Sequence, residues 1–424
     1  MEQFKDIFEG IFNFEWQFLI MYVIGGVLIY LAVKKDFEPM LLLPIGFGAI
    51  LVNLPLQAIW ENADKTPGVL QVLHNAGIAT ELFPVLIFIG IGAMTDFTPL
   101  FQNPRMIFFG AAAQFGIFFT ILGVLGLNFI LPEESKFLFR EAVATGIIGA
   151  ADGPTSIVVA KEFASQLMGP ISVAAYSYMA LVPVIQPPVI KLLTTKKERM
   201  IRMEAKKGSV SKAVLVMFPI VVTIISGIIA PISAPLIGLL MFGNLIKECG
   251  VLERLNKAAQ NELANIVTLL LGITIGASMK HENFMQIKTI IILALGLVAF
   301  IFDTAGGVLF AKLLNLFTKK KINPMIGAAG ISAFPMSARI VQRMAKEEDP
   351  YNFILMPAIS ANVSGQIGSV IAGGVILSIV PNIDPDGAIR AAEALAKTAT
   401  EGLTIISSLI PNISGVLQNL TSLF

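Results

Sequence analysis

The sequence predicts an all-α membrane protein that crosses the lipid bilayer many times. Of its 424 residues, 55% are hydrophobic and only 14% are charged, whereas a soluble domain usually carries about a quarter charged residues. A single core cannot hide this much apolar surface from water, so lipid is the expected solvent. The apolar residues also gather into segments separated by short polar connections, as repeated membrane crossings require.

Apolar segments recur along most of the chain, but many of them are imperfect. A clean transmembrane helix needs about 20 consecutive apolar residues. Several segments are shorter, and others are interrupted by Gly, Pro or polar residues. We therefore expect about ten or eleven transmembrane segments, including broken or re-entrant helices. The segments are roughly Trp16–Val33, Met40–Trp60, Leu82–Met94, Met106–Leu131, Ala142–Ala160, Pro170–Leu193, Ala213–Ala230, Pro231–Ile246, Leu263–Met279, Ile287–Phe317, Pro324–Val341 and Phe353–Val380.

The charged and metal-binding residue types indicate an orientation and exclude several classes of protein. A net charge of +1 excludes a nucleic-acid-binding footprint. One cysteine, Cys249, permits no internal disulfide, and with two histidines a Cys/His metal site is not expected. Basic clusters at Lys34–Lys35, Lys191–Lys212 and Lys319–Lys321 are expected in the cytoplasm, which leaves the N-terminus outside if the first apolar segment spans the membrane. That N-terminus carries acidic residues, so a cleaved signal peptide is not expected.

Two halves of the chain share a weak internal repeat. The segment Gly146–Ser156 aligns with Gly327–Ser337, with two glycines, a proline and a serine identical, and Ile91–Met94 resembles Ile275–Ser278. Many secondary transporters are built from repeats, often inverted, that bind ions at their interface. We therefore expect two inverted structural repeats and a transport function. The expected divisions are 1–212 (N-terminal helices, first repeat and a broken helix), 213–385 (second repeat) and 386–424 (a C-terminal helical tail).

Asp152 is the strongest candidate for a functional residue at membrane depth. No other charge lies between Glu141 and Lys161, and a charged side chain at the centre of a membrane helix costs roughly 2.5–3.5 kcal/mol. Gly153 and Pro154 follow, and this pair breaks a helix. A carboxylate beside unwound carbonyl groups suits a hard cation such as sodium. The alternative is a solvated aspartate in a short surface loop, but intramembrane acids are usually functional.

The second half offers amides, hydroxyls and one arginine, which we expect to be buried, in place of an acid. In its last long segment Asn362, Gln366 and Ser369 share one helix face at i, i+4 and i+7. Such residues can also serve only to join helices. For the hydroxyls both roles stay open, whereas the amide of Asn362 needs partners in lipid, which favours function. The polar residues of this half are Asn323, Ser332, Ser337, Arg339, Asn362, Ser364, Gln366 and Ser369.

Two tyrosines and a second acid complete the polar residues at membrane depth. Tyr176 and Tyr178 precede a Gln-Pro-Pro break. They are either interfacial belt residues or phenols that face Asp152 and donate a hydrogen bond or a proton. Asp303 stands alone in a long apolar run with no loop signal beside it, so it is a second candidate intramembrane acid.

Five motifs make the sequence similar to one family of membrane proteins. They are Phe37–Gly48, Gly92–Phe97, Gly149–Thr155, Gly327–Pro335 and Asn362–Ser369. In this order and context they resemble the membrane-embedded β subunit of the biotin-dependent sodium-pumping decarboxylases, the enzymes for oxaloacetate, methylmalonyl-CoA and glutaconyl-CoA. The resemblance covers nearly the whole chain and is weaker at the N-terminus and in the tail.

The resemblance implies a function and a set of partners. A partner α subunit would transfer a carboxyl group from substrate to the biotin it carries, and this chain would decarboxylate the carboxybiotin and couple that reaction to sodium export. The family also implies a small γ-type membrane subunit, a homo-oligomer of the membrane subunit, and the inner membrane of a prokaryote. The fold it implies is an inverted repeat with broken helices that meet near the membrane centre.

The same resemblance assigns roles to individual residues. The family's essential acid falls on Asp152 and its proton-handling tyrosine on Tyr178. Its functional positions in the second half fall on Asn323, Gly327, Ser332, Arg339 and Asn362. The expected catalytic residues are therefore Asp152, Tyr178, Ser332 and Arg339. The expected sodium ligands are Asp152, Asn323, Ser332 and Asn362, and Arg339 and Asn323 are expected to contact carboxybiotin.

The chemistry of these residues fits a proton-for-sodium exchange. Decarboxylation of carboxybiotin consumes a proton, and a buried acid and phenol are suitable carriers. Sodium bound at Asp152 favours its ionised form, and the departure of sodium favours the proton. The main rival is a sodium-coupled secondary transporter of a small carboxylate, which needs no biotin partner. A purely structural scaffold explains neither Asp152 nor the polar repeat, and no Walker sequence indicates a nucleotide site.

Overall fold

The computed structural model describes residues 9–36, 38–56, 59–61, 65–203, 208–229, 231–333 and 335–387. Within these ranges the regular structure is helical, apart from one isolated bridge between Glu61 and Pro67. This confirms the predicted all-α class. The predicted C-terminal tail, 386–424, lies almost entirely outside the described residues.

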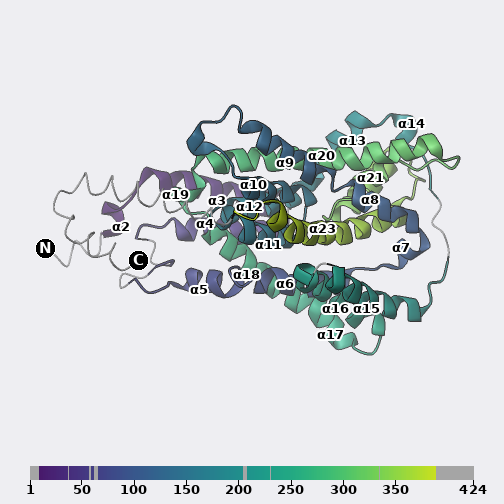
Figure 1. The fold of residues 1–424 in the computed structure, drawn as a ribbon, viewed down its shortest axis with the longest axis horizontal. Coiled ribbons are helices and arrows are strands. Elements are labelled where there is room, and N and C mark those ends of the chain that lie inside the picture. Colours follow the sequence, from purple (N-terminus) through teal and green to yellow (C-terminus); the bar gives the residue numbers. More distant parts are fainter. Residues whose placement is uncertain are drawn as a thin grey trace.

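The helices stack side by side with many axes along the long dimension of the molecule (Figure 1). Those before residue 212 are α2 (Glu9–Phe12), α3 (Trp16–Lys35), α4 (Pro39–Val52), α5 (Val69–Gly77), α6 (Leu82–Met94), α7 (Thr98–Gln102), α8 (Ile107–Ala112), α9 (Phe115–Leu127), α10 (Phe139–Gly146), α11 (Gly153–Phe163), α12 (Met168–Ala180), α13 (Val182–Leu193) and α14 (Lys196–Arg199). Those that follow are α15 (Lys212–Ile229), α16 (Ala234–Cys249), α17 (Glu253–Ala258), α18 (Ala264–Ala277), α19 (His281–Phe284), α20 (Ile287–Phe317), α21 (Met325–Ala328), α22 (Met336–Glu348) and α23 (Leu355–Ile383).

In the described part of the chain, seven helical stretches are long and apolar enough to cross a membrane. Two bent helix pairs raise that number to nine: α5 with α6, bent by 62°, and α12 with α13, bent by 67°. The second bend falls where Leu181 ends α12 and Pro183, which lacks an N–H, enters the first turn of α13. The bent pairs agree with the expected broken helices, and α4 is a further, shorter apolar helix. The count of ten or eleven segments stays a prediction.

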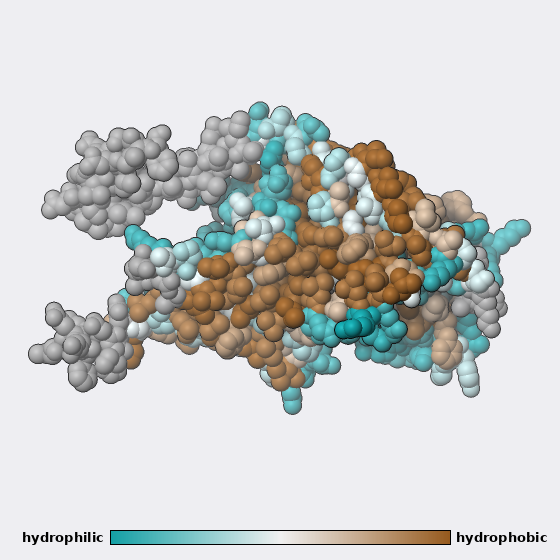
Figure 2. Space-filling model, turned by 90° about the horizontal axis from the view of Figure 1, so that it is seen from below, coloured by the Kyte–Doolittle hydropathy of each residue, from teal (hydrophilic) through white to brown (hydrophobic). Residues whose placement is uncertain are grey.

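The outer surface of these helices is suited to lipid. On the face shown in Figure 2, apolar surface extends over the middle of the molecule, with polar atoms toward its ends and lower edge. α15 is the extreme case, because only 6% of its most apolar window is buried, and Ile228 and Ile229 are 76% and 74% exposed. Large exposed apolar patches are rare on monomeric soluble proteins, and together with the apolar helices this surface identifies the chain as a multi-pass membrane protein.

Two pairs of helices pack together, and in each pair one helix comes from the first half of the chain and the other from the second half. α4 packs along α18, and α16 packs along α6. Each contact is close because glycines face backbone: a Cβ on Gly48 would meet the backbone of α18, and one on Gly243 would meet that of α6. α3 packs on α4 as α15 packs on α16. This reciprocal pattern is what two structural repeats would produce, and the inverted repeat stays a prediction.

Two broken helices form re-entrant hairpins. In the first hairpin (residues 139–166), α10 and the 3-10 turn η3 (Ile147–Ala150) lead to a break, and α11 returns. Its two ends are tied, because Gln166 Nε2 donates to Glu141 Oε1 at 2.7 Å. In the second hairpin (residues 323–352), α21 leads to a break and α22 returns. Here Asn323 and Asn352 both donate to the carbonyl oxygen of Arg199, at 2.8 and 3.2 Å.

The two hairpins enter the protein from opposite ends of α20. The base of the first hairpin meets the start of α20, where Lys288 Nζ lies 3.0 Å from Glu141 Oε2. The base of the second hairpin bonds to Arg199, in the segment that follows α13. The other end of α20 meets the start of this segment, where Lys312 Nζ donates to the carbonyl of Leu193 at 2.8 Å. These two lysines are separated by about 36 Å at 1.5 Å per residue. The tips of the hairpins therefore approach each other from opposite sides of the molecule.

Candidate functional site: an intramembrane polar cluster

Asp152 lies at the tip of the first hairpin. Ala151 adopts a left-handed conformation with φ of 53°, which turns the chain, and Pro154 then opens α11. The aspartate side chain is buried, with 3% of the residue exposed. Its Oδ2 accepts hydrogen bonds from Thr155 Oγ1 and from Ser369 Oγ of α23, both at 2.8 Å. An intramembrane carboxylate is thus held by two hydroxyl groups rather than by a positive charge.

Ser369 joins this carboxylate to the tip of the second hairpin. Its Oγ lies 3.1 Å from Ser332 Oγ and 3.0 Å from the carbonyl of Gln366, and Ser332 Oγ donates to Gln366 Oε1 at 3.0 Å. A hydroxyl carries one hydrogen and two lone pairs, so Ser369 can donate to only one of these acceptors at a time. We call Asp152, Thr155, Ser332, Gln366 and Ser369 the polar cluster. It unites both hairpin tips and α23.

Asn362 lies beside the second tip. Its Nδ2 donates to the carbonyl of Ile331 at 2.7 Å, which satisfies one of the free backbone groups of the break. Its Oδ1 and the Nε2 of Gln366 are buried and have no partner among the described residues. Buried polar atoms are normally paired. A buried amide oxygen without a donor, one helical turn before Gln366 of the polar cluster, is suited to a cation with oxygen ligands.

The structure separates the two tyrosines. The ring of Tyr176 packs against Gly153, where any Cβ would collide with it, and its hydroxyl is buried without a partner in the described chain. Tyr178 instead faces α20: its hydroxyl donates to the carbonyl of Leu293, and a Cβ on Gly296 would lie 2.7 Å from its ring. Tyr176 is therefore the phenol that contacts the Asp152 segment, and the proton-handling role of Tyr178 stays a prediction.

Asn323 lies at the base of the second hairpin rather than at its tip. Its amide is fully used: Nδ2 donates to the carbonyls of Arg199 and Ile201 at 2.8 and 2.9 Å, and Oδ1 accepts from the N–H of Met325 at 3.1 Å. None of the described contacts joins Asn323 to the polar cluster. Its predicted roles as a sodium ligand and a carboxybiotin contact stay predictions.

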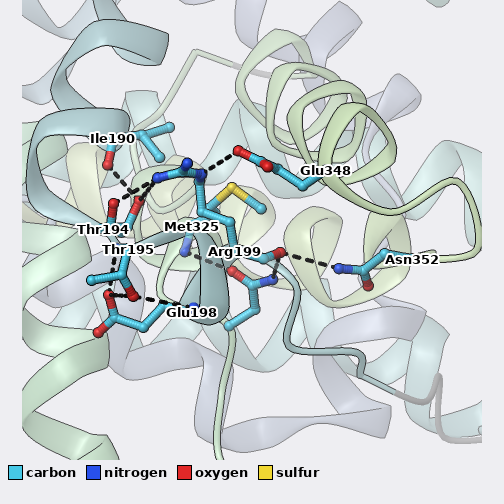
Figure 3. A network of polar contacts seen from close by, with 9 residues as sticks. Ile190, Thr194, Thr195, Glu198, Arg199, Met325, Glu348 and Asn352 are labelled. Carbon is cyan, nitrogen blue, oxygen red and sulfur yellow. Dashed lines mark hydrogen bonds and ion pairs between the residues drawn. The ribbon is translucent and has the colours of Figure 1, made fainter.

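Arg199 connects the segment 194–203, which follows α13, to the base of the second hairpin. Its Nε donates to Glu348 Oε1 at 2.7 Å, and its Nη1 donates to the carbonyl of Thr194 at 2.6 Å (Figure 3). Figure 3 also shows Asn352 directed at the backbone of Arg199. We call residues 194–203 the linker strap, because this short segment holds both ends of the second hairpin through one arginine and its carbonyl.

Removing the arginine of the strap should destabilise the second hairpin. The Arg199→Met variant loses a charge-assisted pair whose side chains are only 13% and 17% exposed, so we expect a loss of about 1–3 kcal/mol of unfolding free energy. The matched control is Arg343→Met, which breaks a 4.0 Å pair with Glu347 between side chains that are 60% and 56% exposed. It should cost less than about 1 kcal/mol. Thermal unfolding in detergent measures both, and equal effects would contradict this role of the strap.

Arg339 is exposed, so the expectation that it is buried is wrong. It lies on α22, whose other face carries the buried residues Ser337, Val341 and Ala345. The amphipathic helix therefore turns this arginine away from the core. Arg339 lines an open depression of about 460 Å³ together with Gln342, Arg343, Lys346, Glu347 and Leu355. The depression belongs to the second hairpin, on the returning helix that ends at the linker strap.

Two residues that hold the tips carried only weak sequence signals. Thr155 binds Asp152 from the first turn of α11, and the sequence indicated it only as the last residue of the Gly149–Thr155 motif. Gln186 bonds to both sides of the second break, because its Nε2 donates to the carbonyl of Ala328 at 2.8 Å and its Oε1 accepts from Ser337 at 3.2 Å. The Gln-Pro-Pro sequence indicated a break but not this partner.

The fold and the site together define a membrane transport protein with a buried acid between two re-entrant hairpins. The family described as the Na+-transporting oxaloacetate decarboxylase beta subunit matches residues 17–380. The chain belongs to this family, as the sequence motifs indicated.

Individual relatives cover most of the chain. It is 49% identical over 372 residues to the glutaconyl-CoA decarboxylase subunit beta of Acidaminococcus fermentans, a match that covers 88% of this chain and 96% of the relative. It is 46% identical to the methylmalonyl-CoA decarboxylase subunit beta of Propionigenium modestum, over 87% of this chain and 96% of that protein. It is 45% identical to the oxaloacetate decarboxylase beta chain 2 of Salmonella typhi, over 85% and 94%.

Proposed function

We propose that this chain decarboxylates carboxybiotin delivered by a partner subunit and couples the reaction to sodium export with proton uptake. The observation that carries the proposal is the carboxylate of Asp152, which is buried where the tips of two hairpins meet and is held by neutral hydrogen-bond donors, with no positive charge beside it. A buried charge without an opposite charge is costly. A sodium ion or a proton at this carboxylate removes that cost, so the site favours exchange between the two.

The polar cluster supplies oxygen atoms for the sodium ion. In this proposal Asp152, Ser332 and Asn362, three of the four ligands that the family resemblance implied, bind the ion, and Ser369 joins them because it contacts both Asp152 and Ser332. The unpartnered Oδ1 of Asn362 supports the same assignment. Because the ligands come from both hairpins and α23, sodium binding would stabilise one arrangement of the tips, which is the differential affinity that coupling requires.

The depression beside Arg339 is the candidate contact for carboxybiotin. A guanidinium group binds a carboxylate through two parallel hydrogen bonds and stays charged at all relevant pH. Biotin would supply the labile carboxyl group, and Arg339 would orient it at the surface of α22. The proposed catalytic groups deeper in the protein are Ser332, Tyr178 and Asp152. Tyr178 and Asp152 would carry the proton that decarboxylation consumes. Asn323 holds the base of the second hairpin, and its direct contacts with sodium and carboxybiotin remain predictions.

The relatives support the proposed partners. Their names describe subunits of decarboxylases for glutaconyl-CoA, methylmalonyl-CoA and oxaloacetate. We infer an α subunit with carboxyltransferase and biotin-carrier parts, a small γ-type membrane subunit, and a homo-oligomer of the membrane subunit. The inner membrane of a prokaryote is the inferred location.

Purification of the native complex tests the proposal. We expect a biotinylated polypeptide to co-purify with the chain, and we expect avidin to abolish sodium transport into inverted vesicles. Sodium transport that survives avidin, with no biotinylated partner in the preparation, would instead support a sodium-coupled secondary transporter of a small carboxylate. If sodium does not change the unfolding temperature of the preparation at all, the result would support neither the decarboxylase subunit nor the secondary transporter.

A further inference from the structure

Asp303 is a second carboxyl group buried at membrane depth. It lies in the middle of α20 and is 0% exposed. The nearest charged residues of its own helix are Lys312 and Lys288, about 14 and 22 Å away along the axis at 1.5 Å per residue. Both lysines are engaged at the ends of the helix, with Glu198 and Glu141 respectively. No described ion pair reaches Asp303.

The two oxygens of Asp303 lie in different environments. Oδ1 accepts a hydrogen bond of 2.6 Å from the N–H of Gly116. This N–H belongs to the first turn of α9, where helical N–H groups have no acceptor of their own and attract negative charge. Oδ2 is buried and has no partner among the described residues. The hydrogen bond to Oδ1 therefore favours the ionised carboxylate, whereas the burial of Oδ2 without a partner favours the neutral acid.

The surroundings of Asp303 contain few groups that could compete for a proton. The elements α8, α9, α21 and η3, which all pack against α20, carry no ionisable side chain. The other described elements that contact α20 and carry ionisable groups are α10, α12, α13, α14 and α19. These groups are Arg140, Glu141, Tyr176, Tyr178, Lys191, Lys196, Lys197, Glu198, Arg199, His281 and Glu282. Glu198 meets α20 at Lys312, Tyr178 at Leu293 and Glu141 at Lys288, about two and a half to four turns from Asp303.

Asp303 lies between the contacts that α20 makes with both hairpins. Its partner Gly116 also supports the first hairpin, because a Cβ on Gly149 would lie 2.9 Å from the carbonyl carbon of Gly116. One turn further along the same face of α20, Gly307 packs directly on the backbone of Gly327 in the second hairpin. A change of charge at Asp303 would therefore act at the place where both hairpins rest on α20.

We propose that Asp303 is a proton-binding site of the transport cycle. The carboxyl group gives its proton to water in one arrangement of the hairpins and takes a proton back in the other, so that an O–H bond breaks and forms with no redox change. This proposal deepens the proposed function, on which it rests, by adding a second site for the proton that accompanies sodium export. A purely structural Asp303 would only cap α9 and would keep one protonation state throughout.

Infrared difference spectroscopy of the purified protein distinguishes these roles. In the Asp152→Asn variant the sodium-site acid is absent, and we expect the carboxyl C=O band of the remaining membrane-depth acid to disappear as pH rises and to return as pH falls. The band should be absent from the Asp152→Asn/Asp303→Asn double variant. A membrane-depth carboxyl band that does not respond to pH in the Asp152→Asn variant would overturn the proposal, even if Asp303 variants fail to fold.

Turnover gives a second readout. Asp303→Asn keeps an oxygen to accept from Gly116 but cannot titrate. We expect sodium-dependent decarboxylation by the complex to fall at least about a hundredfold, while sodium still raises the unfolding temperature through Asp152. The control is Asp96→Asn, an acid whose side chain is 50% exposed, which should leave turnover unchanged. Wild-type turnover and pH profile in Asp303→Asn would contradict the proposal. Failure of the sodium site itself would appear separately, as a loss of stabilisation by sodium in the wild type.

Discussion

Asp152→Asn is expected to abolish sodium-dependent decarboxylation by the assembled complex. The asparagine can still accept from Thr155 and Ser369, so the hairpin tip should keep its shape, but the negative charge that attracts sodium is lost. Removal of one partner of a buried charge pair costs about 2–5 kcal/mol, and each 1.4 kcal/mol is tenfold in affinity. We therefore expect sodium to bind at least about thirtyfold more weakly. Initial rates as a function of sodium concentration measure this effect.

The control for Asp152→Asn separates loss of charge from loss of fold. Thermal unfolding without sodium should be close to that of the wild type, because the asparagine is isosteric. The Thr155→Val variant removes a hydroxyl that donates to the same carboxylate and should weaken sodium binding by a smaller factor, about tenfold. Unchanged sodium dependence of the rate in Asp152→Asn would contradict the assignment of this residue.

Gly327→Ala is expected to lower both the stability of the protein and its rate of sodium-dependent decarboxylation. Gly327 and Gly307 face each other so closely that a Cβ on either would overlap the backbone of the other. The obstacle is backbone, which cannot rotate away as a flexible side chain can. Overpacking of this kind costs about 1–3 kcal/mol or more, and the second hairpin would have to move along α20. A shift of about 1 Å at a reaction site can reduce rates a hundredfold.

A matched glycine shows whether space is the cause. Gly123 lies in α9, where an added Cβ would meet no other atom within 4 Å, and an alanine there favours the helix by up to about 1 kcal/mol. Gly123→Ala should therefore keep or slightly raise the unfolding temperature and leave turnover unchanged. Equal stability and turnover of Gly327→Ala and the wild type would show that α20 and the hairpin do not rest on each other as described.

The sequence was most informative where membrane physics acts on single residues. The all-α membrane class follows from composition, and the break at Asp152 follows from Gly153 and Pro154 beside an isolated charge. The helical spacing of Asn362, Gln366 and Ser369 correctly indicated a shared face, because all three side chains form hydrogen bonds with a hairpin tip. These features depend on local chemistry and on the period of a helix, which one sequence contains.

The positions of Asn323 and Arg339 depended on packing that a single sequence does not contain. Asn323 follows a basic cluster and precedes a proline, a pattern that fits either a hairpin base or an ion site. Its actual partners, the carbonyls of Arg199 and Ile201, are more than a hundred residues away. Arg339 lies in a helix with a strongly polar face, and only the docking of α22 decides which way that face points. The choice between Tyr176 and Tyr178 likewise depends on how α12 meets α20.

Equilibrium binding of radioactive sodium to the purified chain tests the central claim most directly. The structure predicts saturable binding to the wild type that is lost in Asp152→Asn and weakened about tenfold or more in Ser369→Ala, because Ser369 joins the carboxylate to the tip of the second hairpin. Saturable binding of wild-type affinity in both variants would contradict a sodium site in the polar cluster.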